Sequence, residues 1–393
     1  MSFLKIKTLF SALLCALLVA VFISCSNKEI SQSDDTSDTS PSQEQEEQTN
    51  SPVTVPDVND DKPDVPDVPD ETPEAPTEPI IQEPAFINPL TGLASDKDLT
   101  NKRPVAVMIN NLKQALPQIA VSEAEVVYET LEEGGITRLL CIYNDYSDIP
   151  EIGSIRSTRD YYIDVTDAHD AILVHAGAST YAYTALAQRN TSNLDGLYLS
   201  QFYRSPERMK TMSREHTLMI SGSGIDDAIS YKGYRTTSEK PSPLVFDQNF
   251  TLGSTTANHI SIPFSIGYNA NPYITSYFDY GSTSKLYHKG HFNTPHIDGD
   301  DGQQLAFKNV ITLTCPMNII KGDPLGCIQV HFTGTGKGTY FVEGTSREIV
   351  WSKPSRGSAY TLYESDGETP LVLAPGKSYI AIVPTGTNIT VNE

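Results

Sequence analysis

The body of the chain opens with short runs in which nearly every position is apolar. Pro104 to Asn110 and Ala171 to His175 are rich in aliphatic residues, which is typical of strands covered on both faces of a sheet. Val126 to Glu132 and Ile136 to Asn144 are similar runs, and the glycines between them favour a tight turn. The pattern therefore predicts two buried strands and a hairpin in the interior of a sheet.

Helix signals alternate with these strands. Ser157 and Asp160 approximate a capping box, so a helix is expected from there toward His169. Ser179 is expected to start a second helix that ends near Arg189. Further helical stretches are predicted as a short turn at Ser122 to Glu125 and as a helix at Ile225 to Tyr231. Strands and helices alternate up to about residue 235, which indicates an α/β layered sheet.

After Pro241 the pattern changes to short alternating runs, rich in tyrosine and threonine and broken by glycine. The last predicted strands are Thr339 to Val342, Glu348 to Trp351, Ala359 to Tyr363, Pro370 to Leu373 and Tyr379 to Val383. We therefore expect an N-terminal α/β domain at residues 86–238 and a mainly β C-terminal domain at residues 239–393.

The first 25 residues have the features of a secretory signal. Lys5 and Lys7 precede an apolar run from Leu9 to Ile23 that is short for a transmembrane helix. The run is followed by a small residue and Cys25, the pattern that a lipoprotein signal peptidase cuts before a diacylated thiol. We predict a signal peptide at residues 1–24, lipidation of Cys25 and a position on the extracytoplasmic face of the bacterial cell membrane. An ordinary signal peptide with an incidental Cys25 and an uncleaved anchor are the alternatives.

Residues 25–85 differ in composition from everything after them. Between Ser26 and Pro84 there are 17 acidic residues, two lysines, 10 prolines and no aromatic residue. Such a segment buries too little apolar surface to offset the entropy of ordering it. We predict a disordered, acidic, Pro-rich linker that reaches on the order of 100 Å if extended at ~3.1 Å per residue.

The linker carries most of the chain's net charge of −21. The remaining body is acidic and has no basic stripe, so nucleic acid is not an expected partner. Of the cysteines in the body, Cys141 lies in an apolar run and is expected to be buried. Cys315 ends one strand-like segment and Cys327 begins the next. The sequence allows either a disulfide between them or two free thiols.

Several short motifs follow one another along the body. They are Arg103 to Asn111, Val127 to Glu129, Glu133 to Arg138, Gly153 to Arg159, Val174 to Gly177, Pro295 to Asp298, Asn309 to Ile311 and Trp351 to Lys353. In these motifs the chain resembles the YerB-like lipoprotein family over essentially everything after Ala85. The resemblance implies an extracytoplasmic bacterial lipoprotein with an α/β layered fold, and it supplies no reaction. Typical members have proline after the glycine of the arginine motif, where this chain has Ser154.

Arg156 and Arg159 flank the predicted start of a helix. Their guanidinium groups can converge near the free backbone N–H groups of that helix, which is suitable chemistry for a phosphate or carboxylate. Teichoic acid or a peptidoglycan stem peptide would supply such a group. The alternative is that these arginines pair with internal carboxylates such as Glu129 or Glu132.

Three further residues are assigned to the same ligand-binding region. His175 ends a buried strand, at the kind of sheet edge where α/β proteins place ligands. A core histidine with a backbone partner is the alternative. Arg138 follows the glycine turn, and Asn110 ends the first buried strand. The predicted ligand-binding set is therefore Arg156, Arg159, His175, Arg138 and Asn110.

Two pairs of residues are candidates for catalysis. On a continuous strand Glu129 and Glu133 would share one face, with Glu132 on the other, so the first two could act as general acid and base as in glycosidases. Glutamates near an exposed hairpin tip are otherwise solvated. His296 and Asp298 are two apart and form the second candidate pair.

The densest group of metal-capable side chains is His288, His291, His296 and Asp298. Its spacing is loose and contains glycine, unlike the regular helical arrangement of zinc peptidases. Hydrogen-bonded histidines are the alternative. We therefore predict no metal ion and no cofactor, and these four residues remain candidates only.

The sequence has no Gly-x-Ser-x-Gly elbow, no phosphate-binding P-loop and no dinucleotide fingerprint. We expect a membrane-anchored, non-enzymatic binding or scaffolding protein whose partner is an envelope polymer or a membrane protein. The long linker favours this hypothesis, because reach matters to a protein that must find a target away from the bilayer. The alternative is a cell-wall hydrolase or transferase that uses the carboxylates and histidines in a cleft between the two domains.

Overall fold

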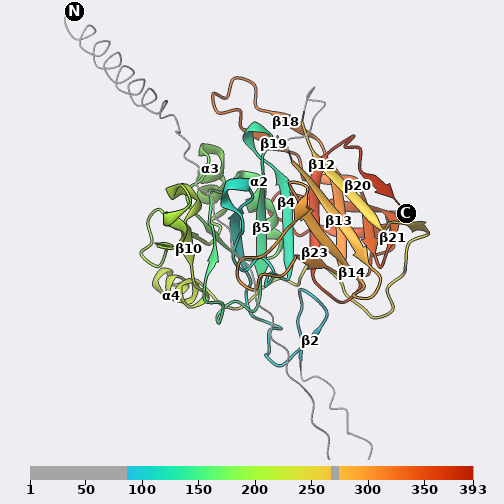
Figure 1. Ribbon diagram of the computed structural model, residues 1–393, viewed down its shortest axis with the longest axis horizontal. Coiled ribbons are helices and arrows are strands. Elements are labelled where there is room, and N and C mark those ends of the chain that lie inside the picture. The colour runs from blue at the N-terminus through green and yellow to red at the C-terminus, as the bar shows by residue number, and fades with distance from the viewer. Residues whose placement is uncertain (1–85, 267–273, 393) are drawn as a thin grey trace, which may run out of the picture. The chain divides into compact units, whose positions relative to one another are not determined.

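The computed structural model describes residues 86–266 and 274–392, and its largest element is a sheet of eleven strands (Figure 1). The strand order is β11, β21, β20, β17, β23, β4, β5, β3, β7, β8, and β22 also pairs with β21. The strands are β3 (Val105–Asn110), β4 (Val126–Leu131), β5 (Thr137–Tyr143), β7 (Ile172–His175), β8 (Asn193–Asp195), β11 (Thr255–Thr256), β17 (Asn309–Cys315), β20 (Gly334–Val342), β21 (Thr345–Lys353), β22 (Thr361–Glu364) and β23 (Ser378–Pro384).

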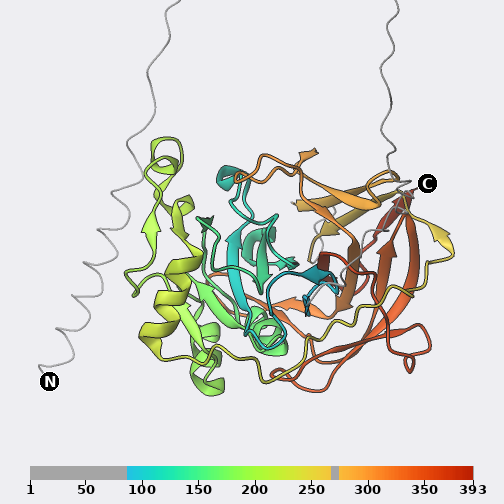
Figure 2. The same cartoon turned by 90° about the horizontal axis from the view of Figure 1, so that it is seen from below.

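Both halves of the chain contribute to this sheet. β23 pairs in parallel with β4, with Ser378 opposite Val126 and Ile382 opposite Thr130. Every residue of β4 is buried, as expected for parallel strands covered on both faces. Figure 2 shows the orange and red strands continuing from the green strands, around which the helices gather. The predicted fold class, α/β followed by mainly β, is confirmed, and the two halves share one sheet.

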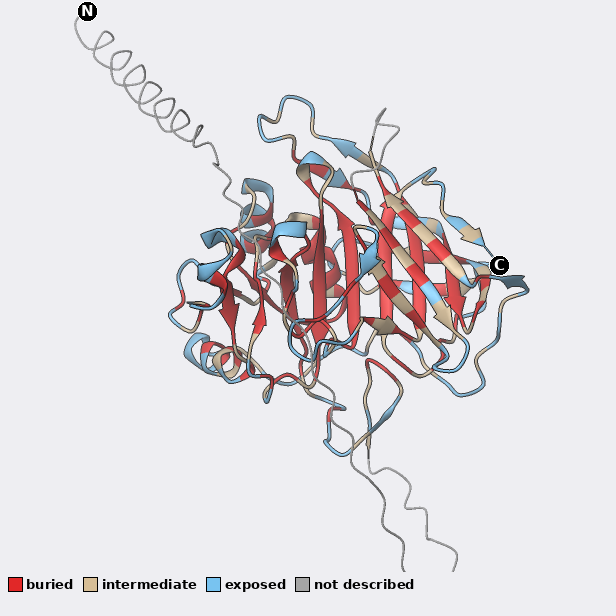
Figure 3. Cartoon of the chain, in the orientation of Figure 1, coloured by how far each residue is buried: buried red, intermediate tan, exposed pale blue. Residues whose placement is uncertain are grey.

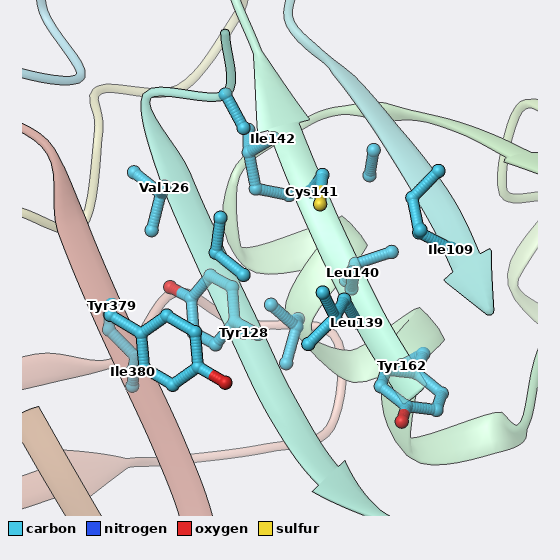
Figure 4. Close-up of a cluster of buried hydrophobic side chains, with 14 of the residues drawn as sticks. Ile109, Val126, Tyr128, Leu139, Leu140, Cys141, Ile142, Tyr162, Tyr379 and Ile380 are labelled. Atoms are coloured by element: carbon cyan, nitrogen blue, oxygen red, sulfur yellow. The ribbon is translucent and has the colours of Figure 1, made fainter. Parts of the chain in front are cut away.

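The core of the sheet is the predicted hairpin. β4 and β5 pair antiparallel, with Val126 opposite Ile142 and Leu131 opposite Thr137. Figure 4 shows apolar side chains of both strands, among them Leu140, packed in one cluster, and every residue of β5 is buried. The apolar runs therefore become strands because both of their faces are covered.

Three helices cover the N-terminal half, and they are α2 (Asp160–Ala168), α3 (Thr180–Arg189) and α4 (Gly222–Lys232). The Ser179 hydroxyl accepts a hydrogen bond from the N–H of Ala182 at the start of α3. Ser221 caps α4 in the same way, so α4 begins three residues before the predicted start. All three predicted helices are confirmed.

The predicted capping box at Ser157 is wrong. The residue before the first turn of α2 is Arg159, which makes no capping hydrogen bond through its side chain. The N–H of Thr158 donates to the carbonyl of Gly177, 3.0 Å away. The backbone therefore stays extended beside the sheet until Arg159, and Ser157 lies too early to cap the helix.

Two further predictions of local structure are wrong. No helix forms at residues 122–125. The N–H groups of Glu123 and Ala124 close turns on the carbonyls of Ala120 and Val121, and the Glu125 carboxylate accepts a hydrogen bond from the N–H of Asn144 instead of capping. Pro370 and Leu373 form isolated bridges rather than a strand. The disulfide left open between Cys315 and Cys327 is not formed, because both are buried free thiols.

A second sheet of six strands packs against the large one. Its order is β15, β14, β13, β12, β24, with β16 also paired to β14. The strands are β12 (His259–Phe264), β13 (Ile274–Gly281), β14 (Leu286–His291), β15 (Thr294–Pro295), β16 (Ala306–Phe307) and β24 (Thr390–Asn392). Buried and less buried residues alternate along β12 and β14, which Figure 3 shows as alternating red and tan. One face of this sheet therefore belongs to the core and the other is open.

The remaining elements are short. They are β1 (Phe86–Ile87), β2 (Ala94–Ser95), β6 (Ile152–Gly153), β9 (Tyr203–Arg204), β10 (Leu218–Ile220), β18 (Met317–Ile319), β19 (Ile328–Val330) and the 3-10 turns η1 (Lys113–Ala115), η2 (Glu133–Gly135), η3 (Arg208–Lys210) and η4 (Arg214–His216). No helix in residues 86–266 or 274–392 is long and apolar enough to span a membrane. The predicted signal peptide, Cys25 and the linker lie outside the described residues.

Candidate functional site

The structure brings most of the predicted ligand-binding residues to one end of the large sheet. Asn110 at the end of β3 lies opposite Arg138 at the start of β5. The N–H of Ala176, directly after His175, donates to the carbonyl of Arg156, 3.0 Å away. We call Arg138, Arg156 and Arg159 the arginine cluster.

Two of the three arginines are neutralised inside the protein. Arg138 Nη1 lies 2.6 Å from Glu132 Oε2, and the Glu132 side chain is fully buried. Arg159 Nη2 lies 2.7 Å from Glu133 Oε2 and 3.5 Å from Glu132 Oε2. These contacts favour the alternative that the arginines bind internal carboxylates, with Glu132 as the shared partner.

Arg156 is the member of the arginine cluster that still has an unused hydrogen-bond donor. Its nearest carboxylate is Glu215, 3.4 Å away, whose side chain is 57% exposed. Arg156 Nε is buried and has no hydrogen-bond partner in the described part of the chain. Burial and the neighbouring Arg138 guanidinium lower the pKa of Arg156. An anion could therefore compete with Glu215 for this one arginine.

His175 and Asn110 are held by the protein itself. His175 is fully buried, with Nδ1 2.9 Å from the carbonyl of Gly177 and Nε2 3.2 Å from Asn193 Oδ1. The Asn110 amide lies 2.8 Å from His216 Nδ1. Both residues orient the loops around the arginine cluster, as the core-histidine alternative expects.

The predicted carboxylate pair does not form. Glu129 is fully buried in β4 and accepts hydrogen bonds from Asn111 (2.9 Å) and from the hydroxyls of Thr137 and Ser276 (2.6 Å each). Glu133 lies beyond the strand in η2 and binds Arg159. The two glutamates therefore share no face, because the strand ends before Glu133.

Glu129 instead belongs to a buried polar network between the two sheets. Lys289 Nζ lies 3.1 Å from the Ser276 hydroxyl that also bonds Glu129. Burial acts against ionisation of Glu129, but the charges of Lys289 and His291 and its hydrogen bonds outweigh burial and lower its pKa. Burial lowers the pKa of Lys289 to about 8. The sequence did not reveal this network, because its members come from strands far apart in the chain.

The four metal candidates are divided between two faces of the six-stranded sheet. The rings of His291 and His296 stack with their centroids 5.2 Å apart, and both residues are buried. His288 lies on the opposite face of β14, where its Nε2 is 3.0 Å from the Ser284 hydroxyl. Among the described residues no group of three or more His, Cys, Asp or Glu is arranged to hold a metal ion.

His296 and Asp298, the second catalytic candidates, both have structural partners. His296 Nε2 lies 2.7 Å from Gln118 Oε1. Asp298 accepts hydrogen bonds from the N–H groups of Ala120 (2.9 Å) and Ser122 (2.6 Å). Both side chains are about 1% exposed, so they hold the loop of residues 118–122 against the second sheet.

A concave site lies at the C-terminal end of α2, and sequence reasoning missed it. It is a cavity of about 530 Å³, within the size range of small-molecule sites. The cationic side chains that line it are Arg103, Arg189, Arg235, Lys240 and Arg356. The carboxylates that line it are Asp167, Asp170 and Glu239. We call this site the basic cavity.

Three of these arginines have carboxylate partners. Arg189 Nη1 lies 2.6 Å from Asp164 Oδ1, and Arg356 Nη2 lies 2.6 Å from Asp160 Oδ2. Arg235 pairs with Asp170. These pairs form the walls of the cavity and fix their guanidinium groups in place.

Other cations at the basic cavity have only carbonyl and hydroxyl partners. Arg103 is 6% exposed and donates from Nε to the carbonyl of Asp170, 2.7 Å away. Lys240 Nζ donates to the carbonyl of Asp167, 3.1 Å away. Among residues 86–266 and 274–392, neither cation has a carboxylate within 4.0 Å. Burial, followed by the charge of Arg235, lowers the pKa of Arg103.

Lys353 supports the wall of the cavity from behind. It is fully buried, and its Nζ donates to the carbonyls of Ser355 (3.0 Å), Arg356 (2.8 Å) and Ser358. Burial lowers its pKa to about 8. Arg103 and Lys353 both fall in the motifs of the family resemblance, so those motifs contained a signal for this site.

Comparisons with known proteins match both halves of the chain. Residues 90–235 match the family described as protein of unknown function (DUF3048), N-terminal domain, and residues 264–380 match its C-terminal domain. A Bacillus subtilis (strain 168) protein described as "Putative lipoprotein YerB" is 31% identical over 299 residues, which is 75% of this chain and 86% of that protein. The crystal structure of YerB from Bacillus subtilis matches with a TM-score of 0.68 and 28% identity, and covers 78% of this chain and 99% of that one. The basic cavity has residues from both matched ranges, and Glu239 and Lys240 lie between them.

Proposed function

The chain belongs to the YerB-like lipoprotein family, built from the paired DUF3048 domains, and from this membership we propose that it is a lipid-anchored, non-enzymatic binding protein of the cell envelope whose basic cavity holds an anionic group of its ligand. The observation that carries the proposal is the lining of the basic cavity. Five cations line it, and two of them, Arg103 and Lys240, have no carboxylate within 4.0 Å among the described residues.

An anion would give Arg103 and Lys240 a direct ionic partner. A buried cation without a counter-charge in contact is costly, and backbone carbonyls carry only partial charges. Arg103 is in this state, because it is buried and its hydrogen bonds go to carbonyl and serine hydroxyl oxygens. Arginine offers planar, bidentate donors that fit a phosphate or a carboxylate. A ligand bearing either group would therefore gain from contacts that the protein has already ordered.

The anchor and the linker suggest where such a ligand is found. Lipidation of Cys25 would hold the chain at the membrane, on its extracytoplasmic face. The acidic linker would let the body search far from the bilayer. An envelope polymer with phosphate or carboxylate groups, such as teichoic acid or a peptidoglycan stem peptide, or a membrane protein with acidic side chains, fits this arrangement.

The alternative function, a cell-wall hydrolase or transferase, needs reactive groups that reach a substrate. Glu129 and His296 are buried, and Glu133 is paired with Arg159. The binding proposal therefore predicts no turnover of purified wall material. If the parent chain does turn over wall material and Glu129→Gln abolishes that turnover, the result supports the enzyme instead.

The direct test is thermal unfolding of the full chain in detergent with glycerol 3-phosphate, citrate or lipoteichoic acid, and with glycerol as the uncharged match. At ten times its Kd, a ligand should stabilise the protein by about 1.4 kcal/mol. That raises Tm by roughly 3 °C for a protein of this size. The double variant Lys240→Gln with Arg356→Gln should weaken binding about tenfold, a loss of about 1.4 kcal/mol.

Lys210→Gln is the matched control for this variant. Lys210 is 64% exposed and pairs with Glu207, far along the chain from the cavity residues. It should leave the ligand-dependent rise in Tm unchanged. No rise with any of the three anions, or the same rise with glycerol, would overturn the proposal and direct the search to protein partners.

A further inference from the structure

The open face of the six-stranded sheet carries a second concave site, apart from the basic cavity. A groove of about 320 Å³ lies over β12, β13 and the turn between β14 and β15. At roughly 30 Å³ per water molecule it has room for about ten waters, which is close to the volume of one sugar ring and part of the next. The groove is therefore large enough for a small polar ligand.

The floor of the groove is aromatic. Tyr277 on β13 lies opposite Gly290 on β14. Because Gly290 has no side chain, nothing from β14 covers the tyrosine at this register position, and an added Cβ there would lie 3.5 Å from Tyr277 Cβ. The ring of His259 lies beside that of Tyr277, with centroids 6.1 Å apart and planes 29° from parallel. The two rings are stacked, and together they make the floor of the groove aromatic.

The rim of the groove is polar and held in place. His259 Nδ1 lies 2.5 Å from Asp279 Oδ1, which orients a carboxylate that is 67% exposed. Gln304 donates from Nε2 to the carbonyl of Lys289, 2.8 Å away, so its amide plane is fixed. Asn293 is exposed in the β14–β15 turn, and its side chain has no hydrogen-bond partner among the described residues. The rim therefore presents a carboxylate, two amides and an imidazole around the aromatic floor.

The chemistry of this lining selects among ligand classes. Among the described residues no lysine or arginine lines the groove, so this lining lacks the cationic donors that bind phosphate or carboxylate. Carboxylate and amide side chains offer both acceptors and donors, which matches the hydroxyl groups of a sugar. The C–H face of a sugar ring is apolar and can lie on the face of a tyrosine, where it covers aromatic surface.

We propose that this groove, lined by Tyr277, His259, Asp279, Asn293 and Gln304, is a carbohydrate-binding site that takes an uncharged sugar ring. The sugar stacks on Tyr277, and its hydroxyl groups bond the carboxylate and the amides of the rim. The proposal does not depend on the basic cavity, because no residue is common to the two sites.

The test is saturation-transfer NMR on the full chain in detergent, with chitotetraose and maltotetraose as probes. A shallow groove for one ring should give a Kd of roughly 1 mM, so about 10 mM sugar is a sufficient concentration. Tyr277→Ser should abolish the transfer signal of the bound oligosaccharide, and Asn293→Ala with Gln304→Ala should weaken binding about tenfold. Tyr231→Ser is the matched control, because Tyr231 is a 75% exposed tyrosine on α4, outside the groove.

Each outcome decides the proposal. Loss of sugar binding in Tyr277→Ser, with Tm within a few degrees of the parent and with binding intact in Tyr231→Ser, supports it. No binding of either oligosaccharide by the parent chain overturns it, as does equal binding in Tyr277→Ser. If Tyr277→Ser fails to fold, the Asn293 and Gln304 double variant decides, because Asn293 is exposed and Gln304 is only half-buried.

Discussion

The arginine cluster lies at the start of α2, whereas the basic cavity opens at its end and reaches back through Arg356 to Asp160, and the two groups pair their cations differently. At the start of the helix, Arg138 and Arg159 contact Glu132 and Glu133 at 2.6 and 2.7 Å. At its end, Lys240 contacts only the carbonyl of Asp167. A group of arginines is therefore not a binding site by itself, and what matters is whether the fold supplies their counter-charges.

The dipole of α2 explains part of this difference. The N-terminal end of a helix favours anions, which suits the glutamates there, and the C-terminal end favours cations. The carbonyls at the end of α2 are thus natural partners for Lys240. However, a helix end carries only about half an elementary charge, so it does not balance the cations of the basic cavity.

The largest expected effect comes from breaking the internal pairs of the arginine cluster. Glu132→Gln removes the buried carboxylate that contacts Arg138 and Arg159. Burial raises the pKa of Glu132 to about 7, so unfolding is compared at about pH 8, where the carboxylate is ionised. Loss of one partner of a buried ion pair costs about 3 to 5 kcal/mol of unfolding free energy. Urea unfolding measures it, with Glu215→Gln as the control, which should cost less than about 1 kcal/mol because that pair is exposed. Equal effects of the two variants would show that the cluster is not held by Glu132.

The next effect is a pH dependence of ligand binding at the basic cavity. Lys353 has its pKa lowered to about 8, and the charged groups that act on it are Asp164 and Asp167 of α2, Arg189 of α3 and Lys240. Between pH 8 and the usual lysine value near 10.5 the unfolded chain binds the proton and the folded chain does not, so stability rises with pH across this window.

An anion in the cavity favours the charged lysine, so its affinity should fall as pH rises above 8. Calorimetry with glycerol 3-phosphate, which is already a dianion above about pH 7.5, should show binding weaken about threefold to tenfold between roughly pH 7.5 and 9.5. A constant affinity over this pH range would show that the charge of Lys353 does not contribute to ligand binding.

The smallest expected effect is on ligand binding when the arginine cluster is altered. Arg156→Ala with Arg159→Ala should change the affinity for glycerol 3-phosphate less than about twofold, because neither arginine lines the basic cavity and solvent ions screen their charges. The ligand-dependent rise in Tm measures this directly. If Arg156→Ala with Arg159→Ala abolishes the rise in Tm while Lys240→Gln with Arg356→Gln does not, the anion binds at the arginine cluster and not at the basic cavity.

The local features of the fold could be predicted because they depend on neighbouring residues. The apolar runs of β3, β4, β5 and β7 indicated strands covered on both faces, and Ser179 indicated the start of α3. The same reasoning failed at Ser157, where long-range bonding to Gly177 keeps the backbone extended. A local signal is thus reliable only where tertiary hydrogen bonds do not compete with it.

The sites were harder to predict because their members are brought together by pairing of distant strands. Glu129 was expected to work beside Glu133, yet its partners include Ser276, nearly 150 residues away. The parallel pairing of β23 with β4 joins the two halves. No periodicity in the sequence specifies which distant strand will be the neighbour.

By itself the sequence determined the main strands and helices of the N-terminal half and the family, because hydrophobic periodicity, helix caps and short motifs depend on residues close together in the sequence. Only the tertiary structure decided which charges are balanced. Arg138 and Arg103 are both buried arginines in recognisable motifs, but one meets Glu132 and the other meets only backbone carbonyl and serine hydroxyl oxygens. Whether a charge is neutralised depends on contacts within a few ångströms, and those contacts arise only when distant segments pack together.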